Sequence, residues 1–195
     1  PGQIYDGEAA RMTYTTQLND SAAAMGVALD LRSEPIYSEG EGAAWIAEAE
    51  GKKVDGLCVI VLDRQEHAWP TATKAADSPI PTVVFSPLGT SFTTNTQSFV
   101  GKTGVVVYST DRFEQAAYGL KMLATKARLD RSLCVVIQDD KSGDVKLPGT
   151  GITLRYAPGQ RYIETYEATP ESDEVLAMAD DYMKRATRVL GASRQ

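Results

Sequence analysis

A run of polar side chains follows the abrupt end of an apolar stretch in residues 59–70, VIVLDRQEHAWP. Its candidate chemistry lies in Asp63, Glu66 and His67, and His67 is the only histidine among the 195 residues. An imidazole beside a carboxylate can act as a general acid or base, or bind the hydroxyl groups of a ligand. Neighbouring side chains point in different directions, so the cluster cannot converge on one atom. We therefore predict a ligand contact through His67, with Trp69 and Asp63 beside it. The alternative is that Asp63 caps the following helix.

A second polar segment, residues 85–96 (FSPLGTSFTTNT), consists mainly of small and hydroxylated residues. Gly89 allows the main chain to approach a ligand closely, and Thr90 and Ser91 add hydroxyl groups. The segment contains neither of the two glycine-rich phosphate-binding motifs. It predicts contacts to an oxygen-rich ligand through Gly89, Thr90 and Ser91, and the alternative is a polar surface loop.

The third polar segment, Gln138 to Lys141, contains the adjacent carboxylates Asp139 and Asp140. Consecutive carboxylates rarely share a cation without a third ligand, so a solvated loop is favoured here. One histidine and two cysteines exclude a zinc finger, and no G-x-S-x-G nucleophile motif occurs. The sequence predicts no catalytic residue, no metal ligand and no cofactor within this chain.

All three polar segments follow apolar runs that are typical of β-strands. Continuous apolar runs are typical of strands that are buried on both faces of a parallel sheet. In such sheets ligands bind outside the carboxyl ends of the strands, where these polar segments would lie. The expected strands are residues 27–31, 56–62, 82–85, 104–108, 133–137 and 151–156.

Amphipathic helices alternate with these strands. Helical spacing of apolar residues predicts helices over 8–25, ending at Gly26, over 41–50, ending at Gly51, and over 111–129 and 171–190. Another follows Asp63, and residues 139–151 read as a loop. The alternation predicts an α/β fold, a three-layer sandwich with a mostly parallel sheet of Rossmann-like or flavodoxin-like type.

The order of elements also predicts the domain organisation. The sequence begins with a helix, whereas domains of this type normally open with an apolar strand that nucleates the sheet. We expect that the first strand is missing and that the chain is a piece of a longer protein. Residues 1–168 would form the α/β domain, and residues 169–195 a helix that leads towards a following domain.

Composition narrows the classes of partner. The net charge of −6 argues against nucleic acid, which selects basic patches, and no basic block or long apolar run suggests a membrane. A cytoplasmic location is favoured, while secretion after cleavage of a leader stays open. Cys58 and Cys134 lie in apolar runs and are expected to be two buried, unpaired thiols.

Four segments, in this order, resemble the N-terminal part of the L-arabinose isomerase / L-fucose isomerase superfamily, particularly its divergent sugar-isomerase-like members. They are VDGLCVIVLDRQEHAWP (54–70), IPTVVFSPLGTSF (80–92), DRFEQAAYGLKMLATKARLDRSLCVVI (111–137) and YEATPESDEVLAMADDYMKRA (166–186). The resemblance implies a Rossmann-like or flavodoxin-like domain that gives polar contacts to a sugar, often across a subunit interface. It implies a divalent metal, usually manganese, held by later domains of a homo-oligomeric full-length protein. By position, His67 is most similar to a sugar contact.

Two other functions fit the same sequence. One is a non-catalytic carbohydrate-binding module that resembles one lobe of a periplasmic sugar-binding protein, with Trp69 and either Tyr108 or Trp45 stacking on a sugar ring. The other is a flavodoxin-like interaction domain without a small ligand. The leading expectation is the N-terminal domain of a sugar-isomerase-like protein, with the metal chemistry outside this chain.

Overall fold

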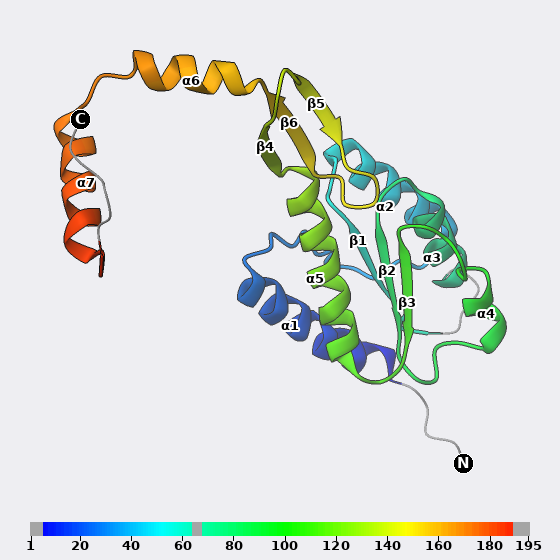
Figure 1. The fold of residues 1–195 in the computed structure, drawn as a ribbon. Coiled ribbons are helices and arrows are strands. Elements are labelled where there is room, and N and C mark those ends of the chain that lie inside the picture. The colour runs from blue at the N-terminus through cyan, green and yellow to red at the C-terminus, as the bar shows by residue number, and fades with distance from the viewer. Residues whose placement is uncertain (1–5, 64–67, 189–195) are drawn as a thin grey trace. The chain divides into compact units, whose positions relative to one another are not determined.

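The computed structural model describes residues 6–63 and 68–188 and divides after Arg131 into two compact units. Helices and mostly parallel strands alternate along the chain, so the predicted α/β class is confirmed. Figure 1 shows the elements of both units. Unit 1 is a three-layer sandwich and carries the predicted ligand-binding edge, and unit 2 has a separate mixed sheet.

The sheet of unit 1 has three parallel strands in the order β1, β2, β3. These are β1 (Leu57–Ile60), β2 (Thr82–Ser86) and β3 (Val105–Ser109). Ile60 lies opposite Phe85 in the first pair, and Phe85 lies opposite Tyr108 in the second. The central strand β2 is buried along its whole length, as the apolar run Val83, Val84 and Phe85 at its centre predicts.

Helices cover both faces of this sheet (Figure 1). On one face lie α1 (Gly7–Met25) and α5 (Phe113–Asp130), and on the other lie α2 (Glu39–Lys52) and α3 (Ala68–Asp77). Because side chains alternate along a strand, each face has its own core. The first core is formed by Leu18, Phe85, Phe113, Ala116 and Leu120, and the second by Val61, Trp69, Ala72, Ala76, Val84 and Phe99.

Polar caps fix the helix ends of unit 1. The Asp6 carboxylate accepts the Ala9 N–H at the start of α1, and Gly26 ends this helix with a φ of 63°. The hydroxyl of Ser38 caps α2, which continues past the predicted end at Gly51 to a left-handed Lys53. A short helix, α4 (Thr93–Gln97), which the sequence analysis missed, precedes β3.

The strand predicted over residues 27–31 is not formed, because no neighbouring strand pairs with this segment. Its only recorded backbone hydrogen bond joins the Val27 N–H to the Ala22 carbonyl and belongs to the end of α1. Burial nevertheless alternates over residues 27–30, since Val27 and Leu29 are half-buried and Ala28 and Asp30 are exposed, and the alternation ends at Leu31, which is 39% exposed. Residues 27–30 thus have the side-chain pattern of a strand without a hydrogen-bonding neighbour.

Helices α2 and α3 pack closely at Gly42, and we predict opposite effects of alanine at the two ends of α2. A Cβ atom at Gly42 would lie 2.4 Å from the Thr71 Oγ1 atom, so Gly42→Ala should lower the free energy of unfolding by about 1–3 kcal/mol. A Cβ atom at Gly51 meets nothing within 4 Å, so Gly51→Ala should raise it by about 0.5–1 kcal/mol. Urea unfolding followed by circular dichroism measures the free energy of unfolding of both variants. Equal changes in Gly42→Ala and Gly51→Ala would contradict the close packing at Gly42.

Unit 2 has a three-stranded sheet in the order β4, β6, β5. Strands β4 (Leu133–Ile137) and β6 (Thr153–Ala157) are parallel, and β5 (Gly143–Lys146) is antiparallel to β6. Strand β5 lies inside the predicted loop 139–151, so that prediction is wrong there. Polar residues and glycine in this short strand hide its periodicity.

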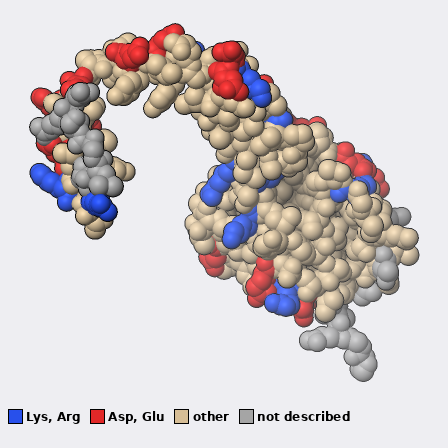
Figure 2. Space-filling view, viewed as in Figure 1, with Lys and Arg blue, Asp and Glu red and all other residues tan. Residues whose placement is uncertain are grey.

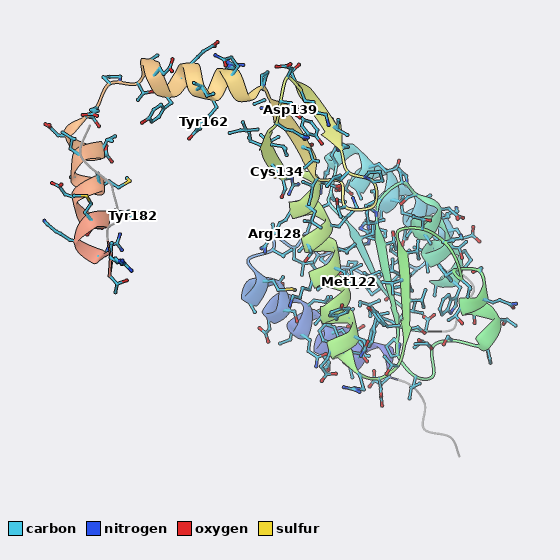
Figure 3. The ribbon with its side chains drawn as sticks, viewed as in Figure 1. Met122, Arg128, Cys134, Asp139, Tyr162 and Tyr182 are labelled. Atoms are coloured by element: carbon cyan, nitrogen blue, oxygen red, sulfur yellow. The ribbon has the colours of Figure 1, made fainter. Side chains whose placement is uncertain are left out.

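Two helices follow, α6 (Gly159–Ala168) and α7 (Asp173–Arg185). The sequence analysis missed α6, and the predicted boundary after residue 168 falls between the two helices. Neither helix buries a residue, and Tyr162 and Tyr182 project outwards from them (Figure 3).

Strand β4 was expected to be buried on both faces, yet Val135 is 57% exposed. The predicted burial of Cys134 is likewise wrong, because this thiol is exposed. Figure 3 marks Cys134 on β4. An apolar run alone does not specify that a helix covers the strand.

Charges of both signs are interspersed on the face of the molecule that Figure 2 shows. Exposed ion pairs occur in both units, for example Lys52 with Asp30 at 2.6 Å and Arg155 with Asp144 at 2.8 Å. The Arg155 guanidinium donates hydrogen bonds to the Asp144 carboxylate, and this lowers the pKa of Asp144. Within residues 6–63 and 68–188, no helix combines the length and the apolar character that a membrane span requires.

Candidate functional site at the carboxyl edge of the sheet

The carboxyl ends of the three strands of unit 1 lie side by side. The Val61 N–H donates to the Phe85 carbonyl at 2.9 Å, and the Thr110 N–H donates to the Ser86 carbonyl at 3.1 Å. The residues that follow the strands therefore share one edge: Asp63 after β1, the loop 86–91 after β2, and Thr110 after β3. This is the edge at which parallel α/β sheets bind ligands.

The loop 86–91 is held by its own hydroxyl groups. The Thr90 Oγ1 hydroxyl donates to the Pro87 carbonyl at 2.8 Å and lies 2.9 Å from the Ser86 Oγ atom. Both side chains are fully buried. Thr90 therefore stabilises the loop, and its hydroxyl is occupied inside the protein rather than presented to a ligand.

Trp69 supports the same loop from the core. Its indole Nε1–H donates to the Thr90 carbonyl at 3.0 Å, and its ring packs edge-on against Phe99 with centroids 6.0 Å apart. Only 7% of the residue is exposed, which leaves no free ring face for stacking on a sugar. The structure thus gives Trp69 a positioning role beside the predicted site.

Gly89 and Ser91 are the accessible part of the loop. Gly89 is exposed and has a φ of 96°, a backbone conformation that side chains disfavour. The Ser91 Oγ atom lies 3.2 Å from the Ser109 Oγ atom at the end of β3. Ser109, which the sequence analysis did not single out, thus joins the predicted site through its register opposite Ser86.

Asp63 follows β1 and is half-buried at the same edge. His67 and its neighbours 64–66 lie outside the described residues, so the predicted contact through His67 stays a prediction. The described groups of the edge are a carboxylate, two hydroxyls and exposed main chain. These groups can hydrogen-bond a polar, hydroxylated ligand.

The acidic pair Asp139 and Asp140 belongs to unit 2 (Figure 3 marks Asp139). Both residues are exposed in a turn, and the Asp139 carbonyl accepts the N–H of Gly159, the first residue of α6, at 2.8 Å. No three His, Cys, Asp or Glu side chains within 6–63 and 68–188 are grouped so that they could hold a metal ion.

Residues 111–114, at the start of the third segment that carries the resemblance, lead into α5, which begins at Phe113. Phe113 enters the core and stacks on Tyr14 with centroids 5.8 Å apart. Arg112 and Glu114 remain exposed, 4.0 Å apart. Thr13, Gln17 and Asp111 line a small pocket of about 400 Å³ beside them.

A larger pocket of about 940 Å³ borders the other side of β1. It extends along the strand from Asp55 to Asp63, and the segment 27–37 lines it as well. Cys58 also lines it, and burial raises the pKa of the Cys58 thiol to about 12. The sequence does not predict this pocket, and its one sign of it is the strand-like segment 27–31.

Comparison with protein-family models, with curated proteins and with solved structures finds no match to this chain.

Proposed function

We propose that this chain is the N-terminal α/β domain of a sugar-isomerase-like protein and that the carboxyl edge of its first sheet contributes contacts to sugar hydroxyl groups. The observation that carries the proposal is the exposed hydroxyl pair of Ser91 and Ser109, 3.2 Å apart, on the edge that Asp63 shares. The order of sequence segments that resembles the L-arabinose isomerase / L-fucose isomerase superfamily supports it.

The chemistry of this edge suits binding rather than bond making. A carboxylate accepts hydrogen bonds from sugar hydroxyls, and serine hydroxyls both donate and accept them. Trp69 and Thr90 hold the loop between these groups in place. The described part of the edge offers no activated nucleophile, so the proposal assigns positioning, not proton transfer, to these residues.

A divalent metal would assist the aldose–ketose interconversion of the complete protein by polarising the sugar oxygens. The described residues do not provide a set of ligands for it. We assign no step of the reaction to this chain, and the resemblance is the reason for expecting the metal in later domains.

We predict that single substitutions at the edge weaken sugar binding by the complete protein. Ser91→Ala and Ser109→Ala should each raise the sugar Kd about threefold to tenfold, the effect of one lost hydrogen bond. His67→Ala should have an effect at least as large if His67 contacts the sugar. Isothermal titration calorimetry with a panel of pentoses and hexoses measures these changes.

Ser98→Ala is the matched control, because Ser98 is exposed and its hydroxyl bonds only within its own segment, to the Asn95 carbonyl. This variant should bind sugar like the original protein. Unchanged affinity in Ser91→Ala, Ser109→Ala and His67→Ala would overturn the proposal. Micromolar sugar binding by the isolated 195-residue chain would instead identify a self-sufficient carbohydrate-binding module.

A further inference from the structure

One edge of β1 has main-chain groups without a strand partner. The Leu57 and Val61 N–H groups donate towards β2, to the Pro81 and Phe85 carbonyls, each at 2.9 Å. Main-chain groups alternate in direction along a strand, so those of Cys58 and Ile60 point away from β2. No hydrogen bond from another described residue reaches them. An edge of this kind is a template for another strand.

The pocket of about 940 Å³ lies along this same edge. One wall comes from α1 and α5 and includes Leu18, Leu120, Leu123 and Ala127, and another comes from α2 and includes Trp45 and Ala49. The space therefore lies between the two helical layers, where the sheet itself would continue. Apolar side chains from both layers line it, as they do around a buried parallel strand, and charged side chains such as Glu48, Lys52 and Arg128 line it as well.

The segment 27–31 also lines this pocket. Its first four residues, 27–30, have the alternating burial of a strand, and Leu29 packs against the core that α1 and α5 cover. It makes no backbone hydrogen bond to β1. One additional strand between β1 and 27–31 would give both of them a hydrogen-bonding neighbour.

The handedness of the connections between strands indicates which part of the sequence supplies this additional strand. Crossovers between parallel strands are right-handed. A helix that connects a strand to a neighbour on one side therefore lies on one face of the sheet, and a helix that connects it to a neighbour on the other side lies on the opposite face. Helix α3 leads from β1 to β2, and α2, on the same face, leads from 27–31 to β1 in the same direction. Helix α1 lies on the other face, so it must lead to 27–31 in the reverse direction. The strand before α1 therefore belongs on the β1 side of 27–31, which is the position of the pocket.

We propose that the pocket takes one extended apolar β-strand that runs parallel to β1 and leads directly into α1, so that the polypeptide preceding residue 1 supplies it. The start of α1 supports this source, because a Cβ atom at Gly7 would lie only 3.2 Å from the Leu62 carbonyl oxygen, just after β1. A strand parallel to β1 ends at the same edge, within reach of α1 through a short loop. This inference is independent of the sugar role proposed above.

The test adds a strand to the 195-residue chain and follows amide hydrogen exchange. The extension Thr-Val-Val-Phe-Ser, placed before Pro1, copies β2, which already forms a parallel strand here. We expect the Cys58 and Ile60 amides to exchange on the order of tenfold or more slowly, because the new strand supplies their acceptors. Iodoacetamide should also modify Cys58 more slowly, with the exposed Cys134 as internal reference.

The matched control is the extension Thr-Pro-Val-Pro-Ser, whose prolines cannot donate to a sheet and should give no protection. If the first extension precipitates, Thr-Val-Thr-Val-Thr replaces it. Equal exchange in the extended and unextended chains, or equal protection by the proline control, would overturn the proposal. Two other results would contradict the preceding polypeptide as the source of the strand. One is the same protection by an equimolar free Thr-Val-Val-Phe-Ser peptide, which would assign the strand to a separate peptide. The other is dimerisation of the unextended chain that depends on concentration and protects Cys58 and Ile60, which would assign it to a second copy.

Discussion

Replacing Phe85 by alanine should lower the free energy of unfolding of unit 1 by about 3–5 kcal/mol. Phe85 is fully buried on the central strand β2. Its ring meets the edges of two other rings, with centroids 5.4 Å from Tyr14 on α1 and 5.9 Å from Phe113 on α5. Alanine would leave a cavity where the sheet and both helices of one layer meet, and these elements cannot all close it.

Urea unfolding monitored by circular dichroism measures this loss. Phe92→Ala is the matched control, because Phe92 is 60% exposed and its truncation should change the free energy of unfolding by less than about 0.5 kcal/mol. A loss below about 1 kcal/mol in Phe85→Ala would show that the three rings do not form a tightly packed cluster.

Replacing Trp69 should have the second large effect, and two variants separate its two roles. Trp69→Ala removes a ring that is 7% exposed and should cost about 3–5 kcal/mol. Trp69→Phe keeps most of the packing but removes the N–H that binds the Thr90 carbonyl at 3.0 Å. Leaving that buried acceptor without its donor should cost about 1–3 kcal/mol.

The loop 86–91 should respond specifically to Trp69→Phe. We expect faster amide hydrogen exchange at Thr90 and Ser91 while the exchange of β2 changes little, because the lost bond anchors the loop and not the strand. Trp45→Phe is the control, since Trp45 is half-buried on α2. Unchanged loop exchange in Trp69→Phe would contradict the positioning role of the indole.

Local patterns were sufficient for most elements of unit 1. The run 82–85 predicts β2, and Gly26 marks the end of α1, because strand propensity and a left-handed helix end depend on the local residues. The segment 27–31 shows the limit. Its apolar residues are suited to a strand, but a strand also requires a neighbour, and among residues 6–63 and 68–188 no strand pairs with it.

Unit 2 shows the same limit in another form. The sequence of β4 is as apolar as that of β2, and yet β4 is largely exposed. Burial depends on which helix packs against a strand, and strand composition does not encode that. Strand β5 and helix α6 were missed because short or polar elements have weak periodicity.

The sequence identified the right segment for the candidate site but not the role of every residue. Placement after β2 predicts that Gly89, Thr90 and Ser91 lie at the carboxyl edge, and they do. Thr90 and Ser91 are adjacent and both carry a hydroxyl group, so the sequence does not distinguish them. The fold shows that the Thr90 side chain is buried and that the Ser91 hydroxyl lies at the surface. Trp69 is similar, because an aromatic residue after a strand can stack on a ligand or fill the core.

The bond between the Trp69 indole and the Thr90 carbonyl also gives the protein an optical probe. The chain contains two tryptophans, Trp45 and Trp69, so Trp45→Phe leaves Trp69 as the single tryptophan fluorophore. That fluorophore is buried and bonded to the main chain of the loop that carries Gly89 and Ser91. Its emission wavelength will therefore report any movement of this loop, including one caused by a ligand, without an attached dye.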